Sequence, residues 1–162
     1  MPFVYFNLLH SHANINVKIK QTISRTMKNE VKMLMSFIVD EEPEFLVSPC
    51  EEELISNLKE EGEVWCTARK CESKHCIELN PEGPYLPRDR FSAWIVDVKS
   101  TPLTVGYVFH LASHTLKNMG VLAIKNAVVD DSMARGYGFE ILHHGSWHYY
   151  LKSEEKSSTL DL

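Results

Sequence analysis

Cysteine is the residue type in this chain whose spacing first suggests metal chemistry. Cys66, Cys71 and Cys76 follow one another at intervals of five residues, with Cys50 upstream and His75 beside the last of them. Structural zinc sites prefer cysteine pairs two to four residues apart, so this spacing fits a zinc site poorly. Disulfides are rare in reducing compartments, and we read the chain as intracellular. We therefore predict ordinary buried or surface thiols and assign no metal site.

Three histidines, His143, His144 and His148, surround a predicted hairpin near the end of the chain. Successive residues of a strand face opposite sides, so at most one of His143 and His144 can share a site with His148. A catalytic histidine needs a nucleophile or a carboxylate within hydrogen-bond reach, and no local motif pairs these histidines with Cys50 or Cys66. We favour a half-exposed polar hairpin and leave the catalytic residues unassigned.

The turn Arg135-Gly136-Tyr137-Gly138 resembles the acyl-CoA-binding turn of the Gcn5-related acetyltransferases, where backbone N–H groups at a helix N-terminus hold a pyrophosphate. That mechanism requires a helix beginning near Gly138. The residues that follow, FEILHHGSWHYYL, are β-branched and aromatic and contain a turn, which favours strands. A glycine that permits a sharp loop is the simpler interpretation.

The stretch from Phe91 to Leu142 predicts the central unit of the fold. FSAWIVDV reads as a strand, Thr101 as a helix N-cap and Pro102 as the first helical residue. Apolar residues at helical spacing extend this helix to about Asn118, where Gly120 would end it. GVLAIKNAVV, a loop at Asp130-Asp131-Ser132, and the runs GFEILHH and WHYYLK complete a β-α-β-β-β unit, the last two joined by a tight turn.

The upstream residues add helices near 29–40 and 51–58 and short strands at EFLVSPC, GEVWCTARK and CIEL. The fold class is therefore α+β: a single domain with a mixed β-sheet and two or three helices packed on it. We divide the chain into an N-terminal extension (1–26), the single domain (27–151) and a polar C-terminal tail (152–162). VYFNLL and INVKI in the extension read as short strands, and Met27 is an alternative start.

Composition narrows the range of partners. A net charge of −5 and a pI of about 5.9 argue against a protein that wraps nucleic acid non-specifically, although a local basic site at Lys117, Lys125 and Arg135 is compatible with them. The longest apolar runs fall short of the roughly 18 residues that a membrane span needs. No positive charge precedes residues 3–9, as it would in a signal peptide. We expect a cytoplasmic protein with no membrane partner.

With the elements placed, the chain resembles the tRNA wybutosine-synthesising N4-methyltransferases from about Val31 to Leu142. VKMLMSFI leads into EFLVSPC, where the family has a short strand and a Ser-Ser-Cys-Ser-Gly-Arg turn; WIVDV, LKNMGV, IKN and RGYGFEIL match later segments. The chain departs from the family at the signature turn, which reads Ser48-Pro49-Cys50-Glu51. It also departs at Asp97, where the family has histidine.

The resemblance implies that S-adenosylmethionine donates a methyl group to a ring nitrogen of the tricyclic guanosine derivative beside the anticodon of phenylalanine tRNA. It implies a protein that works mainly by positioning its two substrates. A Gcn5-related acetyltransferase and a non-enzymatic RNA- or protein-binding module are the alternatives. The resemblance assigns cofactor binding to Ser48, Cys50, Asn118, Gly120 and Glu140, and contacts with tRNA to Lys117, Lys125 and Arg135, with the Cys50 turn and the helix end sharing one hollow.

Overall fold

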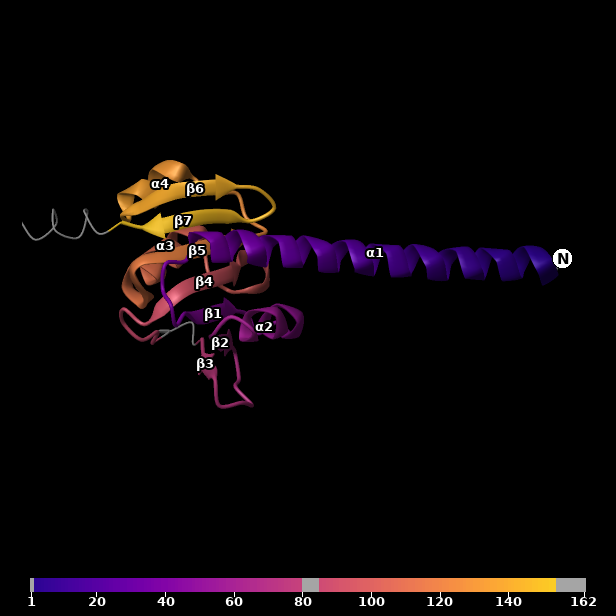
Figure 1. The fold of residues 1–162 in the computed structure, drawn as a ribbon, viewed down its shortest axis with the longest axis horizontal. Coiled ribbons are helices and arrows are strands. Elements are labelled where there is room, and N and C mark those ends of the chain that lie inside the picture. The colour runs from indigo at the N-terminus through magenta and orange to yellow at the C-terminus, as the bar shows by residue number, and fades with distance from the viewer. Residues whose placement is uncertain (1, 80–84, 154–162) are drawn as a thin grey trace, which may run out of the picture.

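The computed structural model describes residues 2–79 and 85–153, with side chains for residues 17–22, 25–79 and 85–153. Seven strands form one sheet in the order β3-β2-β1-β4-β5-β7-β6 (Figure 1). Strands β1 to β5 run parallel, and β7 pairs antiparallel with both β5 and β6. The predicted single domain with a mixed sheet and packed helices is confirmed. The elements are α1 (Pro2–Phe37), β1 (Glu44–Ser48), α2 (Glu52–Lys59), β2 (Glu63–Ala68), β3 (Cys76–Glu78), β4 (Phe91–Asp97), a 3-10 turn (Val98–Ser100), α3 (Val105–Thr115), β5 (Leu116–Lys125), α4 (Asp131–Gly136), β6 (Phe139–His144) and β7 (His148–Lys152).

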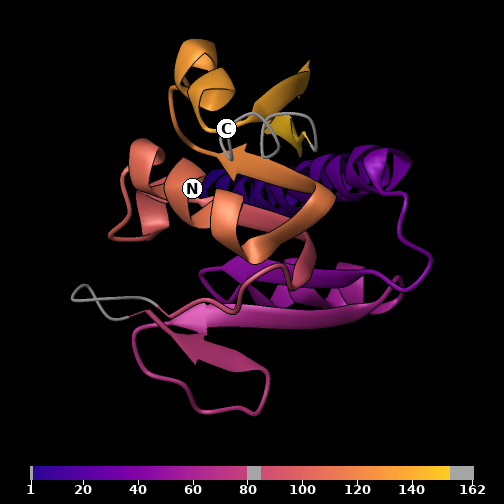
Figure 2. The ribbon, with the colours of Figure 1, turned by 90° about the vertical axis from the view of Figure 1, so that its left-hand side faces the viewer.

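Helices cover both faces of this sheet (Figure 2). The central strand β4 is buried along Phe91–Val96, as expected of a parallel strand covered on both sides. On one face, Trp94 and Val96 pack with Phe109 of α3. On the other, Ile95 lies in the same cluster as residues of α1 and α2. Alternate side chains of β4 therefore pack into two separate hydrophobic cores, one on each face of the sheet.

The first helix, α1, extends far beyond the sheet (Figure 1). Its 36 residues span about 54 Å at 1.5 Å per residue. The strands predicted within residues 1–26 are wrong. Met27, Val31 and Leu34 are buried against the sheet, whereas residues 17–22 are exposed. Because residues 17–22 have no buried side, this part of the helix needs no amphipathic period, and the sequence pattern there gave no helix signal.

The central helix α3 is shorter than predicted at both ends. Its N-cap is Thr104, whose hydroxyl accepts a hydrogen bond from the Tyr107 amide at 3.2 Å, and not Thr101. It ends at Thr115, so Gly120 lies inside β5 and does not cap a helix. Met119 has φ 67° and the β4–β5 register shifts beside it. A Cβ at position 120 would lie 2.7 Å from the Lys117 carbonyl oxygen, so this bulge requires glycine.

The final part of the chain forms the predicted pair of strands. β6 and β7 are joined through Gly145, whose amide donates to the Trp147 carbonyl at 2.9 Å. The predicted loop near Asp130 contains the short helix α4, capped by the Asp130 carboxylate, which accepts from the Ser132 amide at 2.9 Å. A strand follows Gly138, so the helix that an acetyltransferase turn requires there is absent. Residues 154–162 of the predicted tail lie outside the described part of the chain.

Candidate functional site

A crevice lies at the carboxyl ends of the parallel strands. From β1 the chain moves outward to β2 and β3, and it then returns to build β4 and β5 on the other side of β1. In such sheets ligands bind where the strand order reverses, here between β1 and β4. The crevice has a volume of about 360 Å³, within the range of small-molecule sites. Its lining residues are Pro49, Thr67, Ala68, Arg69, Leu79, Lys99, Ser100, Thr101 and Pro102.

Ser48 is the last residue of β1, at the carboxyl edge of the sheet, and only 1% of it is exposed. Its Oγ accepts hydrogen bonds from the Thr67 hydroxyl at 2.7 Å and from the Trp94 indole N–H at 2.9 Å. Three adjacent strands therefore meet at one oxygen. Ser48 was predicted to contact a cofactor, but these bonds hold its side chain inside the sheet, where it positions the turn that follows β1.

Asp97 ends the neighbouring strand β4 and has one side-chain oxygen without a hydrogen-bond partner among the described residues. Its Oδ2 accepts from the Ser100 hydroxyl at 3.2 Å, whereas its buried Oδ1 has no hydrogen-bond partner among the described residues. A buried carboxylate oxygen without a partner is costly, and such groups often mark a place where a ligand binds. The sequence comparison noted Asp97 only as a departure. A carboxylate at the end of a buried, mostly apolar strand was the signal that could have identified it.

Lys125 reaches the same edge from β5 but is already engaged. Its Nζ lies 3.1 Å from Glu51 and 5.2 Å from the centre of the Trp147 ring, and its side chain is 13% exposed. These contacts link the turn after β1 to the end of β5 and to the β6–β7 loop. Lys125, which was predicted to contact tRNA, therefore forms a structural ion pair at the carboxyl end of β5 and does not line the crevice.

A histidine cluster occupies the far part of the carboxyl edge, where His148 pairs in register with Ile124. The Nδ1 atoms of His144 and His148 lie 2.8 Å apart, and His144 Nε2 lies 3.0 Å from Asp131 Oδ2. Tyr150 donates its hydroxyl to the other Asp131 oxygen at 3.0 Å. The prediction that at most one of the two adjacent histidines shares a site with His148 is confirmed. Asp131, which supplies the missing carboxylate, was read as part of a loop.

The hydrogen bonds in this cluster determine where the protons lie. A carboxylate only accepts, so His144 Nε2 carries a proton. When the His144 ring is neutral, its Nδ1 accepts a hydrogen bond from His148 Nδ1. His148 Nε2 is then left with a lone pair. Burial, and then repulsion from His144, lower the pKa of His148 and favour the neutral ring. Although partial burial opposes ionisation, the bonds from His144 and Tyr150 hold the pKa of Asp131 below its ordinary value.

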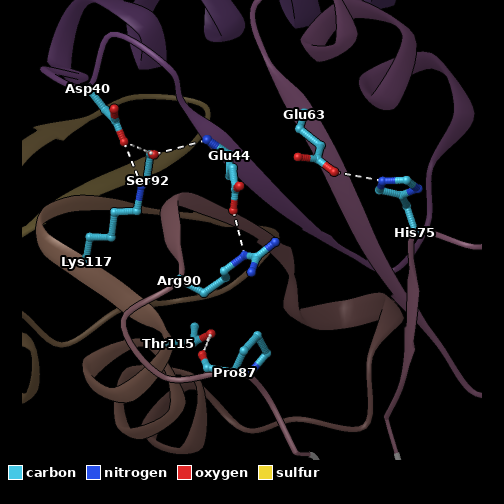
Figure 3. A network of polar contacts seen from close by, with 9 residues as sticks. All are labelled: Asp40, Glu44, Glu63, His75, Pro87, Arg90, Ser92, Thr115 and Lys117. Atoms are coloured by element: carbon cyan, nitrogen blue, oxygen red, sulfur yellow. Dashed lines mark hydrogen bonds and ion pairs between the residues drawn. The ribbon is translucent and has the colours of Figure 1, made fainter.

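The structure does not bring the remaining predicted residues to the crevice. Ser48 aligns with Val96, whereas Val121, which follows Gly120, aligns with Ala93, about 10 Å nearer the amino ends of the strands. The single hollow predicted for the Cys50 turn and the helix end is therefore wrong. Asn118 lies with Gly120 at that opposite end, Lys117 pairs with Asp40 there (Figure 3), Arg135 lies on α4, and Glu140 is exposed on the edge strand β6.

The four cysteines are paired, which corrects the expectation of free thiols. Disulfides join Cys50 to Cys66 and Cys71 to Cys76. The pairs are adjacent, because Cys66 and Cys76 are register partners in β2 and β3. Cysteine spacing alone does not determine which residues pair, and it was the parallel pairing of these two strands that placed all four together.

Comparison with known proteins gives a likeness in structure only. No protein-family model and no curated protein matches the sequence. The tRNA (m1A58) methyltransferase TrmI from Aquifex aeolicus has a similar structure, with a TM-score of 0.55 and 12% identity over 77% of this chain and 68% of that one. A SAM-dependent methyltransferase from Archaeoglobus fulgidus gives a TM-score of 0.50 and 13% identity over 72% of this chain and 69% of that one.

Among the described residues, no helix has the length and apolar character needed to cross a membrane.

At sequence identities of 12% and 13%, the structural matches establish the architecture, and the chemistry must be argued from the site. The chain therefore has the fold of S-adenosylmethionine-dependent methyltransferases.

Proposed function

We propose that this chain is an S-adenosylmethionine-dependent methyltransferase that acts on a base of tRNA, with its cofactor in the crevice between β1 and β4. The observation that carries the proposal is the buried, unpartnered oxygen of Asp97 at the switch point of this sheet. The fold is that of such methyltransferases, and one of its structural neighbours is named as a tRNA methyltransferase.

The crevice residues fit the amino-acid half of the cofactor. S-adenosylmethionine carries an ammonium group and a sulfonium, which need an anion, and a carboxylate, which needs a cation. Asp97, which is hydrogen-bonded to the lining residue Ser100, would supply the anion, and Arg69 and Lys99 in the lining would supply cations. Dinucleotide-binding sheets hold the ribose through an acidic side chain about 20 residues after a glycine-rich first turn. Here Pro49 and Cys50 follow β1 and Arg69 follows β2, so we assign no residue to the ribose.

The rest of the chemistry concerns how the chain handles the acceptor base. When bound, the cofactor supplies an electrophilic methyl group. A ring nitrogen that bears a hydrogen must lose its proton as it is methylated, and the lone pair on His148 Nε2 can accept that proton. The His148 imidazolium would then be stabilised through His144 by the Asp131 carboxylate, the arrangement expected of an oriented general base.

The proposed substrate class rests on the resemblance and on basic side chains at the same edge. Arg69 and Lys99 line the crevice, and one of them could contact a tRNA phosphate while the other holds the cofactor carboxylate. Phosphate contacts of this kind position nucleic acid without reading its sequence. Lys117 and Lys125, by contrast, form ion pairs within the protein. The finer proposal, taken from the resemblance, is the hypermodified guanosine beside the anticodon of phenylalanine tRNA.

The two alternatives have less support. An acetyltransferase of the Gcn5-related type needs a helix after Gly138, where β6 begins instead. A non-enzymatic binding module would be expected to have a filled cofactor cavity, whereas the crevice at the switch point is open. Neither alternative explains the unpartnered Asp97 oxygen at that point.

Calorimetric titration tests the cofactor proposal. S-adenosylmethionine and its demethylated product should bind the full-length chain with micromolar affinity, and acetyl-CoA should not. Asp97→Asn should weaken cofactor binding at least tenfold. Glu41→Gln changes an exposed residue just before β1, at the amino ends of the strands, and should leave the affinity unchanged. Binding of acetyl-CoA alone, or equal affinity in the Asp97 variant, would remove the proposal.

Methyl transfer from labelled cofactor to tRNA tests the reaction and the base. Phenylalanine tRNA carrying the unmethylated tricyclic guanosine should be labelled, and bulk tRNA that already carries the mature base should not. His148→Ala should lower kcat at least 100-fold with little change in cofactor affinity. Labelling at other tRNA positions would replace the wybutosine assignment and retain the methyltransferase.

A tRNA substrate implies a cytoplasmic location, which we retain as part of the proposal. The two disulfides favour an oxidising compartment instead. Thiol alkylation of the protein inside intact cells, followed by mass spectrometry, separates these cases. Four alkylated cysteines support the cytoplasm, and two intact disulfides exclude it.

A further inference from the structure

We propose that the reduced chain binds one Zn²⁺ ion through the thiolates of Cys50, Cys66, Cys71 and Cys76. Cys50, Cys66 and Cys76 come from three separate parts of the fold, the turn after β1, β2 and β3, and Cys71 lies in the connection between β2 and β3. Cys66 in β2 and Cys76 in β3 are register partners, and the Cys50 amide donates to the Thr67 carbonyl at 3.0 Å, which holds the turn after β1 against β2. The inference does not depend on the proposed methyltransferase activity.

The sulfur positions match a tetrahedral metal site. The Sγ atoms of Cys50, Cys66 and Cys76 all lie within 4.8 Å of one another, and those of Cys50 and Cys76 are 3.9 Å apart. Four thiolates at about 2.3 Å from a zinc ion are separated by about 3.8 Å. Cys71 is bonded to Cys76 but lies outside this set of three mutually close sulfur atoms. Once the Cys71–Cys76 bond is reduced, the Cys71 side chain must move toward the other sulfur atoms to supply the fourth thiolate.

The local fold also gives such a site a structural role. Parallel strands are usually joined by a crossover of a dozen or more residues, often a helix, but only residues 69–75 connect β2 to β3. A hollow of about 900 Å³ lies beside this connection, next to α2. With little apolar burial to hold β3 in place, a metal ion that joins three segments would supply the missing stabilisation.

The charged side chains around the hollow balance one another. Lys59, Lys70 and Lys74 line it together with Glu52, Glu63 and Glu72, so the proposal rests on the sulfur ligands and not on the charge of the lining. His75 Nε2 lies 2.8 Å from Glu63 (Figure 3), and its ring packs on Trp65. We assign the fourth position to Cys71 because it is covalently joined to Cys76. The site therefore takes four sulfur ligands and a cation that prefers them.

The two states are related by a balanced exchange. Four equivalents of a small thiol convert the two protein disulfides into four protein thiols, with formation of two small-molecule disulfides. Zn²⁺ then displaces four protons from the protein thiols as four Zn–S bonds form. The metal site and the disulfides thus exclude each other. The thiol–disulfide reduction potential of the compartment determines whether the chain contains the disulfides or the zinc ion.

The test uses the full-length chain, reduced with a small thiol, freed from that thiol without oxygen, and titrated with Zn²⁺ alone against a chromophoric chelator. One equivalent should bind tightly to the reduced chain and none to the oxidised chain. X-ray absorption at the zinc edge should give four sulfur neighbours at about 2.3 Å. Reduced wild-type protein that binds no Zn²⁺, or a shell dominated by nitrogen and oxygen, would overturn the proposal.

Matched variants identify the ligands. Cys71→Ser is the most informative, because this residue lies outside the strands and its loss leaves the sheet pairing intact. It should weaken Zn²⁺ binding at least tenfold, whereas His75→Ala should leave the affinity unchanged. Equal affinity in Cys71→Ser contradicts the four-cysteine site. If a variant fails to fold in its circular dichroism spectrum, the wild-type absorption measurement still decides the question.

Discussion

Lys117 Nζ lies 2.9 Å from Oδ2 of Asp40, a residue 77 positions earlier in the chain. The same carboxylate oxygen accepts the Ser92 hydroxyl at 2.7 Å, and the Ser92 oxygen accepts the Glu44 amide at 3.1 Å (Figure 3). The segment that leaves α1 is thereby attached to β4 and β5 at the amino ends of the strands. A lysine that the resemblance assigned to tRNA instead helps to hold the fold together.

Asp40→Asn should reduce both stability and its dependence on pH. Hydrogen bonds from Lys117 and then Ser92 lower the pKa of Asp40 below its ordinary value of 3.8. A lowered pKa means that the carboxylate stabilises the fold above pH 3.8 and that this contribution disappears as the pH falls further. Urea unfolding at pH 7 should give a loss of roughly 1 kcal/mol. As the pH falls below 3.8, the variant should lose less stability than wild type, and Glu41→Gln should behave like wild type.

Gly62→Ala should be among the most destabilising single-methyl changes in the chain. A Cβ there would lie 2.1 Å from the Pro43 carbonyl oxygen, which is backbone and cannot rotate away. Overpacking of this kind costs about 1–3 kcal/mol. Gly136→Ala is the matched control, since no heavy atom lies within 4 Å of its added methyl group. Thermal unfolding should show a large drop for the first variant, and equal midpoints would show that the Pro43 segment can shift.

Ser48→Ala should cost about 1–3 kcal/mol, because it leaves the buried Trp94 indole N–H and the Thr67 hydroxyl without their acceptor. Ser113→Ala removes a hydroxyl from the exposed side of α3 and should be close to neutral. Denaturant unfolding followed by Trp fluorescence measures both. Similar midpoints for the two variants would mean that the strands do not depend on the Ser48 oxygen.

The pKa of His148 should respond in opposite directions to its two neighbours. Burial lowers it first, His144 lowers it further and Asp131 raises it. His144→Ala should therefore raise the pKa of His148, and Asp131→Asn should lower it. Proton NMR titration of the ring signals reads both shifts directly. Two shifts of the same sign would contradict the arrangement Asp131–His144–His148.

Much of the fold followed from local patterns of the sequence. The runs FSAWIVDV and EFLVSPC became β4 and β1 because buried strands are marked by apolar, β-branched and aromatic residues. The end of α3 was misplaced because Gly120 satisfies two different needs equally well: a helix cap and, as observed, a bulge in a strand. No property of an isolated glycine separates these cases before the β4–β5 pairing is known.

The site was less predictable than the fold. Ser48 and Cys50 were placed correctly at the end of β1, but their side chains are engaged within the protein, one in a hydrogen-bond network and the other in a disulfide. Asp97 and the partnership of Asp131 with His144 depend on which strand ends meet at one edge of the sheet. That information lies in the strand order, which sequence periodicity does not contain.

The edge strand β3 is only three residues long, which limits how this protein can aggregate in concentrated solution. An open border is where a foreign strand can add and start an aggregate, and brevity is one of the ways natural proteins guard against that. The cysteine-linked corner thus protects the chain from growing, strand by strand, into larger assemblies on that side.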